Sequence, residues 1–110
     1  MINILIKRNQ ENEIMAYAVS GHAETAPHGE DIVCAAVSVL TQTTILSMIH
    51  ILGQQPVYSM NEGKLSCQVS VDLNADERRE ATILLESMLL GLKNIQQQYP
   101  AIIVIVDEEV

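Results

Sequence analysis

Residues 21–38 read GHAETAPHGEDIVCAAVS and divide the chain into two parts of different character. Most of residues 22–30 are small or polar, which is typical of a loop that moves or closely approaches a ligand. Apolar residues dominate after this loop, and Asp31 directly before them is the expected N-cap of a helix. We expect this helix to run to about Leu52 and to end at Gly53.

The segment before the loop predicts a β-hairpin. Ile2, Ile4 and Ile6 lie at alternate positions, which gives one strand with a strongly apolar face. Residues 9–13 are polar and predict the turn, and residues 14–19 predict the second strand. The chain therefore enters the loop from the end of a strand.

Three further segments have the composition of strands. Residues 57–60 form a short candidate strand. Residues 65–71 alternate between apolar and polar side chains, as in a strand with one buried face. Residues 102–106 are apolar without interruption, which predicts a strand at the centre of its sheet.

A second long helix is predicted between the last two of these strands. Asn74 and Glu77 have the spacing of a capping box, in which each side chain accepts a hydrogen bond from the other residue's backbone. The helix is expected to extend from Ala75 to about Gln98. Its apolar stripe repeats at three- and four-residue steps and consists of Ala81, Leu85, Met88, Leu92, Ile95 and Tyr99.

The order of these elements, β-β-α-(β)-β-α-β, predicts the fold class. We expect one α+β domain over residues 1–110, with a mixed sheet of about four to five strands covered by two long helices. The length of 110 residues and the hydrophobic fraction of 48% suit one small globular domain. The first helix is apolar on nearly all sides, which predicts that it is the buried centre of the fold.

The charge balance restricts the classes of partner. Six basic and 14 acidic residues give a net charge of −8. A surface of that sign repels nucleic acid phosphates and anionic membranes and attracts basic proteins. The sequence shows no secretory signal and no uninterrupted apolar run of transmembrane length. We therefore expect a cytoplasmic protein without a nucleic acid or membrane partner.

The most reactive pair that the sequence offers is Cys34 with His22. A free thiol is mostly protonated at neutral pH, and a position near a helix start favours its thiolate. With Asp31 as N-cap, Cys34 is the third helical residue, and its N–H group could also stabilise an oxyanion. His22 could act as general base if the loop folds back. The carboxylates of Glu24, Glu30 and Asp31 oppose the thiolate if they lie near the sulfur.

Each of these residues also has a purely structural explanation. Free cysteine is often buried, so Cys34 could simply pack in the core, and His22 could bond only to its local neighbours. His28 is a second candidate base, but it is expected to be exposed, and His50 is expected to be structural. Cys67 lies on the apolar face of its strand and is interpreted as structural.

A zinc site is a further alternative. His22, His28 and Cys34 are ligand types that zinc accepts. They lack the paired spacing that most protein zinc sites have, such as two cysteines separated by two residues. We therefore expect neither a metal nor another cofactor.

The segment around Cys34 closely resembles the signature of the ribosomal-processing cysteine proteases, the Prp family of bacteria. The resemblance rests on Gly21, His22, Ala23, Ala26, Gly29, Asp31, Ile32, Val33, Cys34, Ala35, Ala36, Val37 and Ser38. It implies a cysteine endopeptidase with Cys34 as nucleophile and His22 as general base, while Asp31 caps the helix or supports the site. The residues that it implies for the substrate loop are Gly21, Ala23, Ala26, Gly29 and Ser38.

The resemblance also implies a substrate and an assembly state. The substrate is the N-terminal extension of a large-subunit ribosomal protein, the one numbered twenty-seven, which is cut after an aromatic-rich segment. The family is homodimeric, and Leu84, Leu89 and Leu90 could supply the dimer surface here. The alternative hypothesis is a non-enzymatic acidic binding module or assembly factor for a basic ribosomal protein.

Overall fold

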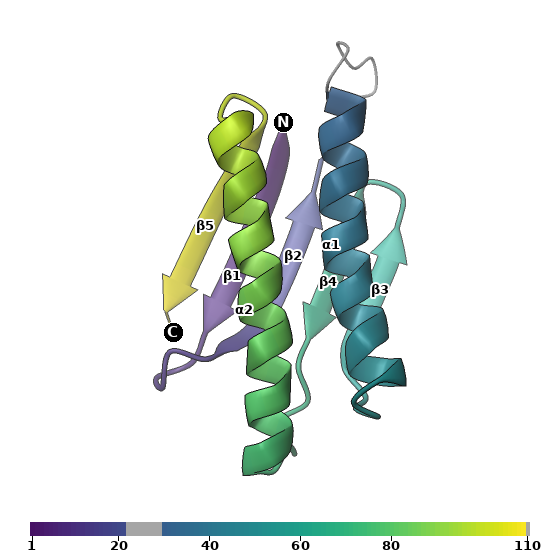
Figure 1. Ribbon diagram of the computed structural model, residues 1–110, viewed down its shortest axis with the longest axis vertical. Coiled ribbons are helices and arrows are strands. Elements are labelled where there is room, and N and C mark those ends of the chain that lie inside the picture. The colour runs from purple at the N-terminus through teal and green to yellow at the C-terminus, as the bar shows by residue number, and fades with distance from the viewer. Residues whose placement is uncertain (22–29, 110) are drawn as a thin grey trace.

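The structure, a computed structural model, describes residues 1–21 and 30–109 and places five strands and two helices in them (Figure 1). In chain order these are β1 (Ile2–Arg8), β2 (Ile14–Ser20), α1 (Glu30–His50), β3 (Val57–Asn61), β4 (Lys64–Gln68), α2 (Ala75–Gln98) and β5 (Ile103–Glu109). The predicted α+β domain, with a mixed sheet and two long helices, is confirmed.

The five strands form one sheet in the order β3-β4-β2-β1-β5. All neighbours are antiparallel except β5, which lies parallel to β1 at one edge. The prediction that β5 is central is therefore wrong. Its apolar run arises because Ile103 is buried against the helices, while Val104 and Val106 lie on the sheet's other face and are 39% and 44% exposed.

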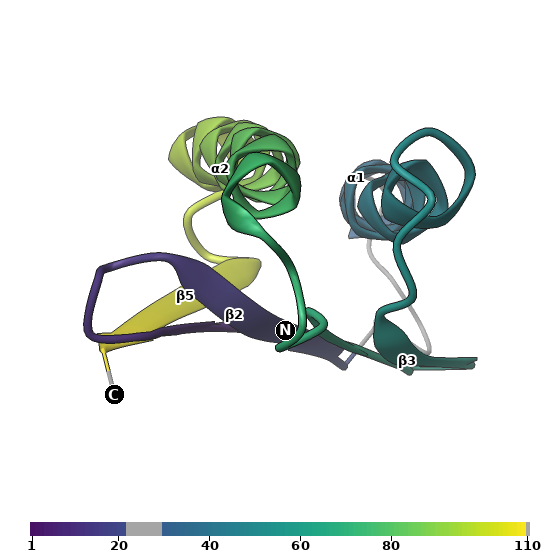
Figure 2. The same ribbon diagram turned by 90° about the horizontal axis from the view of Figure 1, so that it is seen from below.

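Both helices cover the same face of the sheet (Figure 2). The core lies between the two layers and takes alternate residues of the strands, among them Ile2, Ile4 and Ile6 of β1. The stripe predicted for α2 is confirmed, because Ala81 and Leu92 are fully buried within it. Leu89 is also buried, so it cannot form part of a dimer surface as predicted.

The first helix, α1, is not the buried centre of the fold. Val33, Val37 and Ile45 pack into the core, but Ile32 and Val39 on the opposite side are exposed. A helix in a two-layer fold has only one covered side, whatever its composition. By length and composition alone residues 32–50 could cross a membrane, and a core helix passes the same test.

The polar ends of the elements are held by specific hydrogen bonds. The capping box is confirmed, because the Asn74 side chain accepts from the Glu77 N–H at 2.8 Å and Glu77 accepts from the Asn74 N–H at 3.0 Å. At the far end of β1 the buried Arg8 guanidinium donates to Asp107 on β5 and to Glu86 on α2. These contacts join both layers at the end of the molecule where β1 ends.

Candidate active site

The structure places Cys34 at the fifth residue of α1. The helix begins at Glu30, so Asp31 is its second residue and not the predicted N-cap. Only the first four N–H groups of a helix lack an acceptor within it. The backbone N–H of Cys34 is consequently used inside the helix, and the prediction that it is free to bind an oxyanion is wrong.

The Cys34 side chain is half-buried and lines a groove of about 280 Å³ between α1 and the sheet. Ser38 and Gln42 follow Cys34 at four-residue steps and form the helix wall of this groove. The floor comes from the sheet, and the opposite wall is the β3–β4 hairpin from Met60 to Leu65. A thiol in a groove between two walls can meet an extended peptide.

A buried tyrosine holds α1 at its distance from the sheet. The Tyr17 hydroxyl donates a hydrogen bond of 2.7 Å to the backbone carbonyl of Thr41, which also lines the groove. Burial raises the pKa of Tyr17 well above its ordinary value, so the hydroxyl stays protonated and remains a donor. Since Thr41 lies about two turns after Cys34, this bond positions the helix wall of the groove.

The loop leaves the sheet at the groove itself. Gly21, the last residue described before it, lines the groove and has a φ of +88°. A side chain there would place its Cβ 2.4 Å from the Met1 carbonyl oxygen, so only glycine fits. The Gly21 N–H donates to the Gly63 carbonyl at 3.1 Å, which ties the end of β2 to the turn of the β3–β4 hairpin.

Three of the residues predicted for the site come together in the groove: Gly21, Cys34 and Ser38. Other predicted residues lie outside the described part of the chain, namely His22, Ala23, Ala26, His28 and Gly29, together with the side chain of Asp31.

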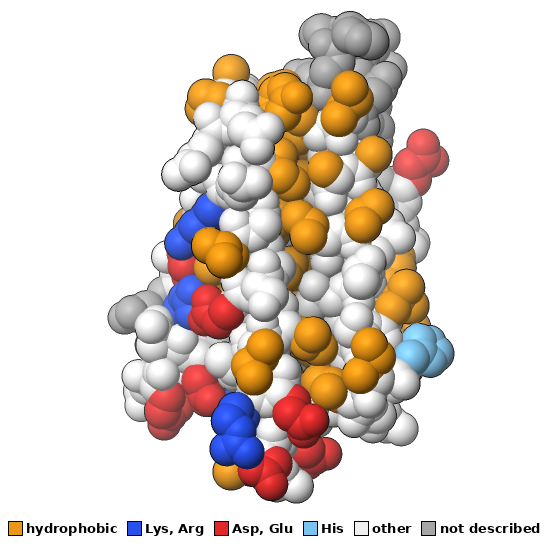
Figure 3. Space-filling model, viewed as in Figure 1, with side chains coloured by type: hydrophobic (Ala, Val, Ile, Leu, Met, Phe, Trp, Pro, Cys, Tyr) orange, Lys and Arg blue, Asp and Glu red, His pale blue; other side chains and the backbone are white. Residues whose placement is uncertain are grey.

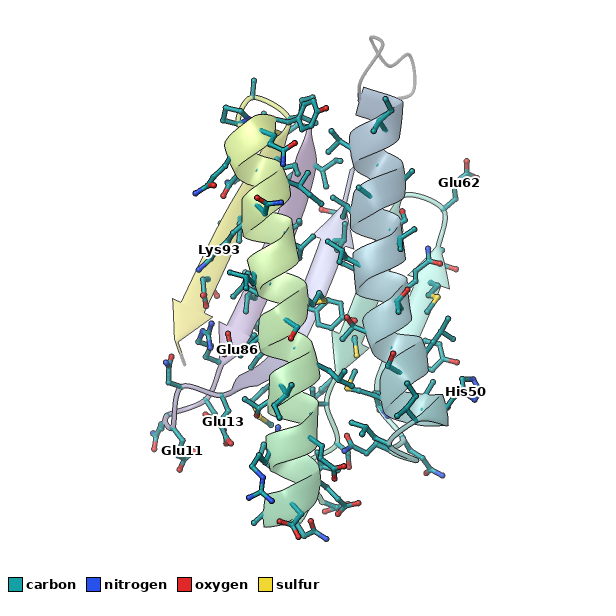
Figure 4. All side chains as sticks on the ribbon, viewed as in Figure 1. Glu11, Glu13, His50, Glu62, Glu86 and Lys93 are labelled. Carbon is teal, nitrogen blue, oxygen red and sulfur yellow. The ribbon has the colours of Figure 1, made fainter. Side chains whose placement is uncertain are left out.

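The described residues support neither another histidine as general base nor a zinc site. His50 lies at the opposite end of α1 from Cys34 (Figure 4). Two of the three proposed zinc ligands, His22 and His28, fall outside the described ranges. Within residues 1–21 and 30–109 no group of three histidine, cysteine, aspartate or glutamate residues could hold a metal ion.

The second thiol, Cys67, is buried on β4 as predicted. Its side chain is 2% exposed, and burial raises its pKa to about 11. The nearby Tyr17 hydroxyl opposes only part of that shift. Cys67 therefore stays a neutral core residue at physiological pH.

No local sequence pattern indicates that the β3–β4 hairpin belongs to the site. Its turn contributes Asn61, Glu62 and Gly63 to the groove. The four-residue spacing of Cys34, Ser38 and Gln42 could have identified the helix wall in advance. Sequence spacing could not identify the hairpin, because only the order of strands in the sheet brings it close to Cys34.

Charge is distributed unevenly over the molecule. Acidic side chains gather at the end where α2 begins, among them Asp76 and Glu80 (Figure 3). Of the described residues that line the groove, only Glu62 and Lys64 are charged. Glu62 points away from α1 (Figure 4). The groove itself is therefore mostly uncharged.

Comparisons with known proteins agree on one family. The family model of cysteine protease Prp matches residues 1–104. The ribosomal processing cysteine protease Prp of Bacillus subtilis (strain 168) is 30% identical over 101 residues, which are 90% of each chain. The protein of the same name from Staphylococcus aureus (strain Mu50) is 33% identical over 101 residues, 90% of this chain and 92% of its own.

Solved structures share the fold. Prp of S. aureus, in complex with a covalently linked product peptide, has a TM-score of 0.83 and 28% identity and covers 98% of this chain and 100% of its own. Protein SMU.848 of Streptococcus mutans has a TM-score of 0.88 and 25% identity and covers 100% of this chain and 96% of its own. These likenesses extend over the whole domain, including α1 and the hairpin that form the groove.

Proposed function

This chain belongs to the cysteine protease Prp family, and from that premise we propose that it removes the N-terminal extension of the large-subunit ribosomal protein numbered twenty-seven. It is a cysteine protease, as the curated relatives are, and their names place them in ribosomal processing. The hypothesis of a non-enzymatic binding module loses its support for the same reason. The single observation that carries the proposal is Cys34 in the groove between α1 and the β3–β4 hairpin.

In the proposed mechanism Cys34 and His22 act as a nucleophile and a general base. The Cys34 sulfur attacks the scissile carbonyl carbon while His22 accepts the thiol proton, and His22 then gives that proton to the leaving amine as the C–N bond breaks. A water molecule, deprotonated by His22, attacks the resulting thioester. The C–S bond breaks, the acid product leaves, and the thiol regains its proton.

The described residues support this division of roles. Cys34 is partly accessible in the groove, whereas Cys67 is buried and protonated. His22 directly follows Gly21, which lines the same groove, and consecutive Cα atoms lie about 3.8 Å apart. The residue that precedes the proposed base in the sequence therefore lines the same groove as the proposed nucleophile. In the S. aureus relative a product peptide is covalently linked, as a nucleophilic mechanism would allow.

The groove also suits the proposed substrate. Val19 and Leu65 contribute apolar surface from the sheet, and Met60 adds a flexible apolar side chain from the hairpin. Such a lining favours an apolar or aromatic side chain next to the scissile bond. We place the reaction in the cytoplasm, where ribosomal proteins are made and assembled.

We further infer that the enzyme acts as a homodimer through its layer of helices. Hydrophobic side chains spread over the outer side of both helices (Figure 3), among them Val39, Ile83 and Leu90. A second groove of about 230 Å³ runs between α1 and α2, and Val39, Leu84 and Met88 are among its lining residues. The molecule measures 44 × 25 Å along its two longer axes, which leaves room for the ~800 Å² per partner that stable dimers bury.

The experiment uses the unprocessed ribosomal protein as substrate and mass spectrometry to locate the cut. Wild-type enzyme is expected to release the N-terminal extension. Cys34→Ala and His22→Ala are each expected to lower the cleavage rate at least a thousandfold, on the order of the loss seen when a catalytic nucleophile is removed. Cys67→Ala is the matched control and is expected to cleave normally. Undiminished cleavage by Cys34→Ala would overturn the proposal.

A further inference from the structure

The two edges of the sheet differ in how they are protected against pairing with a further strand. The β5 edge ends in three acidic residues, Asp107 to Glu109, and charged side chains discourage pairing with another strand. The β3 edge has the sequence VYSMN, without charge or proline, and all five of its residues are exposed. Its composition has high strand propensity, and β4 is its only neighbour in the described sheet. No other described segment pairs with β3, so its outer edge can accept a further strand.

The hairpin register predicts which backbone groups of β3 are available. Asn61 pairs with Lys64 across the two-residue loop Glu62–Gly63, so this is the closing hydrogen-bonded pair. Antiparallel partners alternate between hydrogen-bonded and non-hydrogen-bonded pairs. Tyr58 and Met60 fall at non-hydrogen-bonded positions, and their N–H and C=O groups point away from β4.

This free edge is continuous with the groove that holds Cys34. Met60 and Asn61, the last two residues of β3, line the groove directly. Met60 pairs with the buried Leu65, so its side chain lies on the sheet face that the helices cover. A strand added outside β3 would place alternate side chains on that same face, beside Met60 and next to the opening of the groove.

We propose that the substrate binds as an added strand, in which an extended segment flanking the scissile bond pairs with the free edge of β3. Main-chain hydrogen bonds to Tyr58 and Met60 would supply affinity, and alternate substrate side chains would enter the groove and supply specificity. Every second backbone amide of that segment then faces β3. This inference rests on the proposed function, because it assumes that Cys34 cleaves the peptide.

The test compares two variants at one position in β3. Met60→Pro removes the side chain and the outward N–H, whereas Met60→Ala removes the side chain alone. Proline is tolerated at an edge strand and restricts the residue before it to the extended conformation that Ser59 already has. With a synthetic peptide spanning the processing junction, KM for Met60→Pro is expected to be about fivefold above KM for Met60→Ala, with kcat similar.

A second measurement leaves the enzyme unchanged and so does not depend on the folding of a variant. Single backbone N-methyl groups are placed along the peptide, one position at a time. KM is expected to rise at every second position of the paired segment and to stay the same at the positions between. A rise without this alternation, together with equal KM values for the two Met60 variants, overturns strand addition.

The outcomes separate this inference from the proposed function. If wild-type enzyme does not cleave the unmodified peptide or the ribosomal precursor, the proposed function fails. If cleavage is normal but N-methylation shows no alternation, only strand addition fails. If Met60→Pro instead converts a dimer of the free enzyme to a monomer in sedimentation, the β3 edge pairs two copies of this chain, and the inference is wrong.

Discussion

The two cysteines show how position alone assigns different roles to one functional group. Cys34 is half-buried in a groove, and Cys67 is buried beside Tyr17 with a raised pKa. The strand face of Cys67 was predictable from its alternation with polar neighbours. The helical position of Cys34 was misjudged by two residues, because Asp31 suits an N-cap by type although the helix begins before it. Helix ends are set by competing caps that a single residue type does not resolve.

Cys67 should make the protein less stable in alkaline solution. Its folded pKa of about 11 exceeds the ordinary value of 9.0, so the folded state holds the proton more tightly than the unfolded state. The contribution of Cys67 to the free energy of unfolding is fully present below pH 9.0. It is lost as the pH rises toward about 11, at up to ~1.4 kcal/mol per pH unit. Urea unfolding across this range measures the effect.

Cys67→Ala is the control for this titration. Its free energy of unfolding should be lower overall but should fall less steeply between pH 9.0 and about 11. Tyr17, whose pKa burial also raises, should leave a residual slope at the upper end in both proteins. Equal slopes in the two proteins would show that Cys67 does not titrate as described.

At the scale of elements, the sequence predicted the strands and helices far better than their arrangement. The isoleucine alternation of β1 and the capping box of α2 are local patterns, and both are confirmed. The edge position of β5 and the one-sided burial of α1 depend on which strands pair and which face the helices cover. Those relations are set by contacts between distant segments, which local patterns do not contain.

The candidate site also has one part that the sequence predicts and one part that depends on the arrangement of the strands. Its helix wall follows from the sequence, because Cys34 and Ser38 lie one turn apart on α1. Its second wall comes from the β3–β4 hairpin, which reaches the groove only because β4 pairs with β2. The hydrogen bond from Gly21 to Gly63 fixes that hairpin to the start of the loop. The groove is thus a product of sheet order as much as of the motif around Cys34.

The molecule as a whole exposes hydrophobic side chains on its layer of helices, and the inferred dimer can be tested there. Leu90 on α2 is 72% exposed, and Leu90→Glu should convert the dimer to a monomer, because a carboxylate would be buried at the interface. Val71 in the loop before α2 is 74% exposed, and Val71→Glu is the matched control that should remain dimeric. Analytical ultracentrifugation measures both. A monomeric wild-type protein would contradict the dimer.

An affinity label tests whether Cys34 is the nucleophile. A peptide with the nonprime sequence of the processing junction and a chloromethyl ketone at its end forms a C–S bond and releases chloride when a thiolate attacks it. After digestion and mass spectrometry we expect one adduct, on Cys34. It should form in parallel with the loss of cleavage, and uncleaved substrate should slow its formation. Loss of activity with the adduct on Cys67 or elsewhere, and none on Cys34, would contradict it.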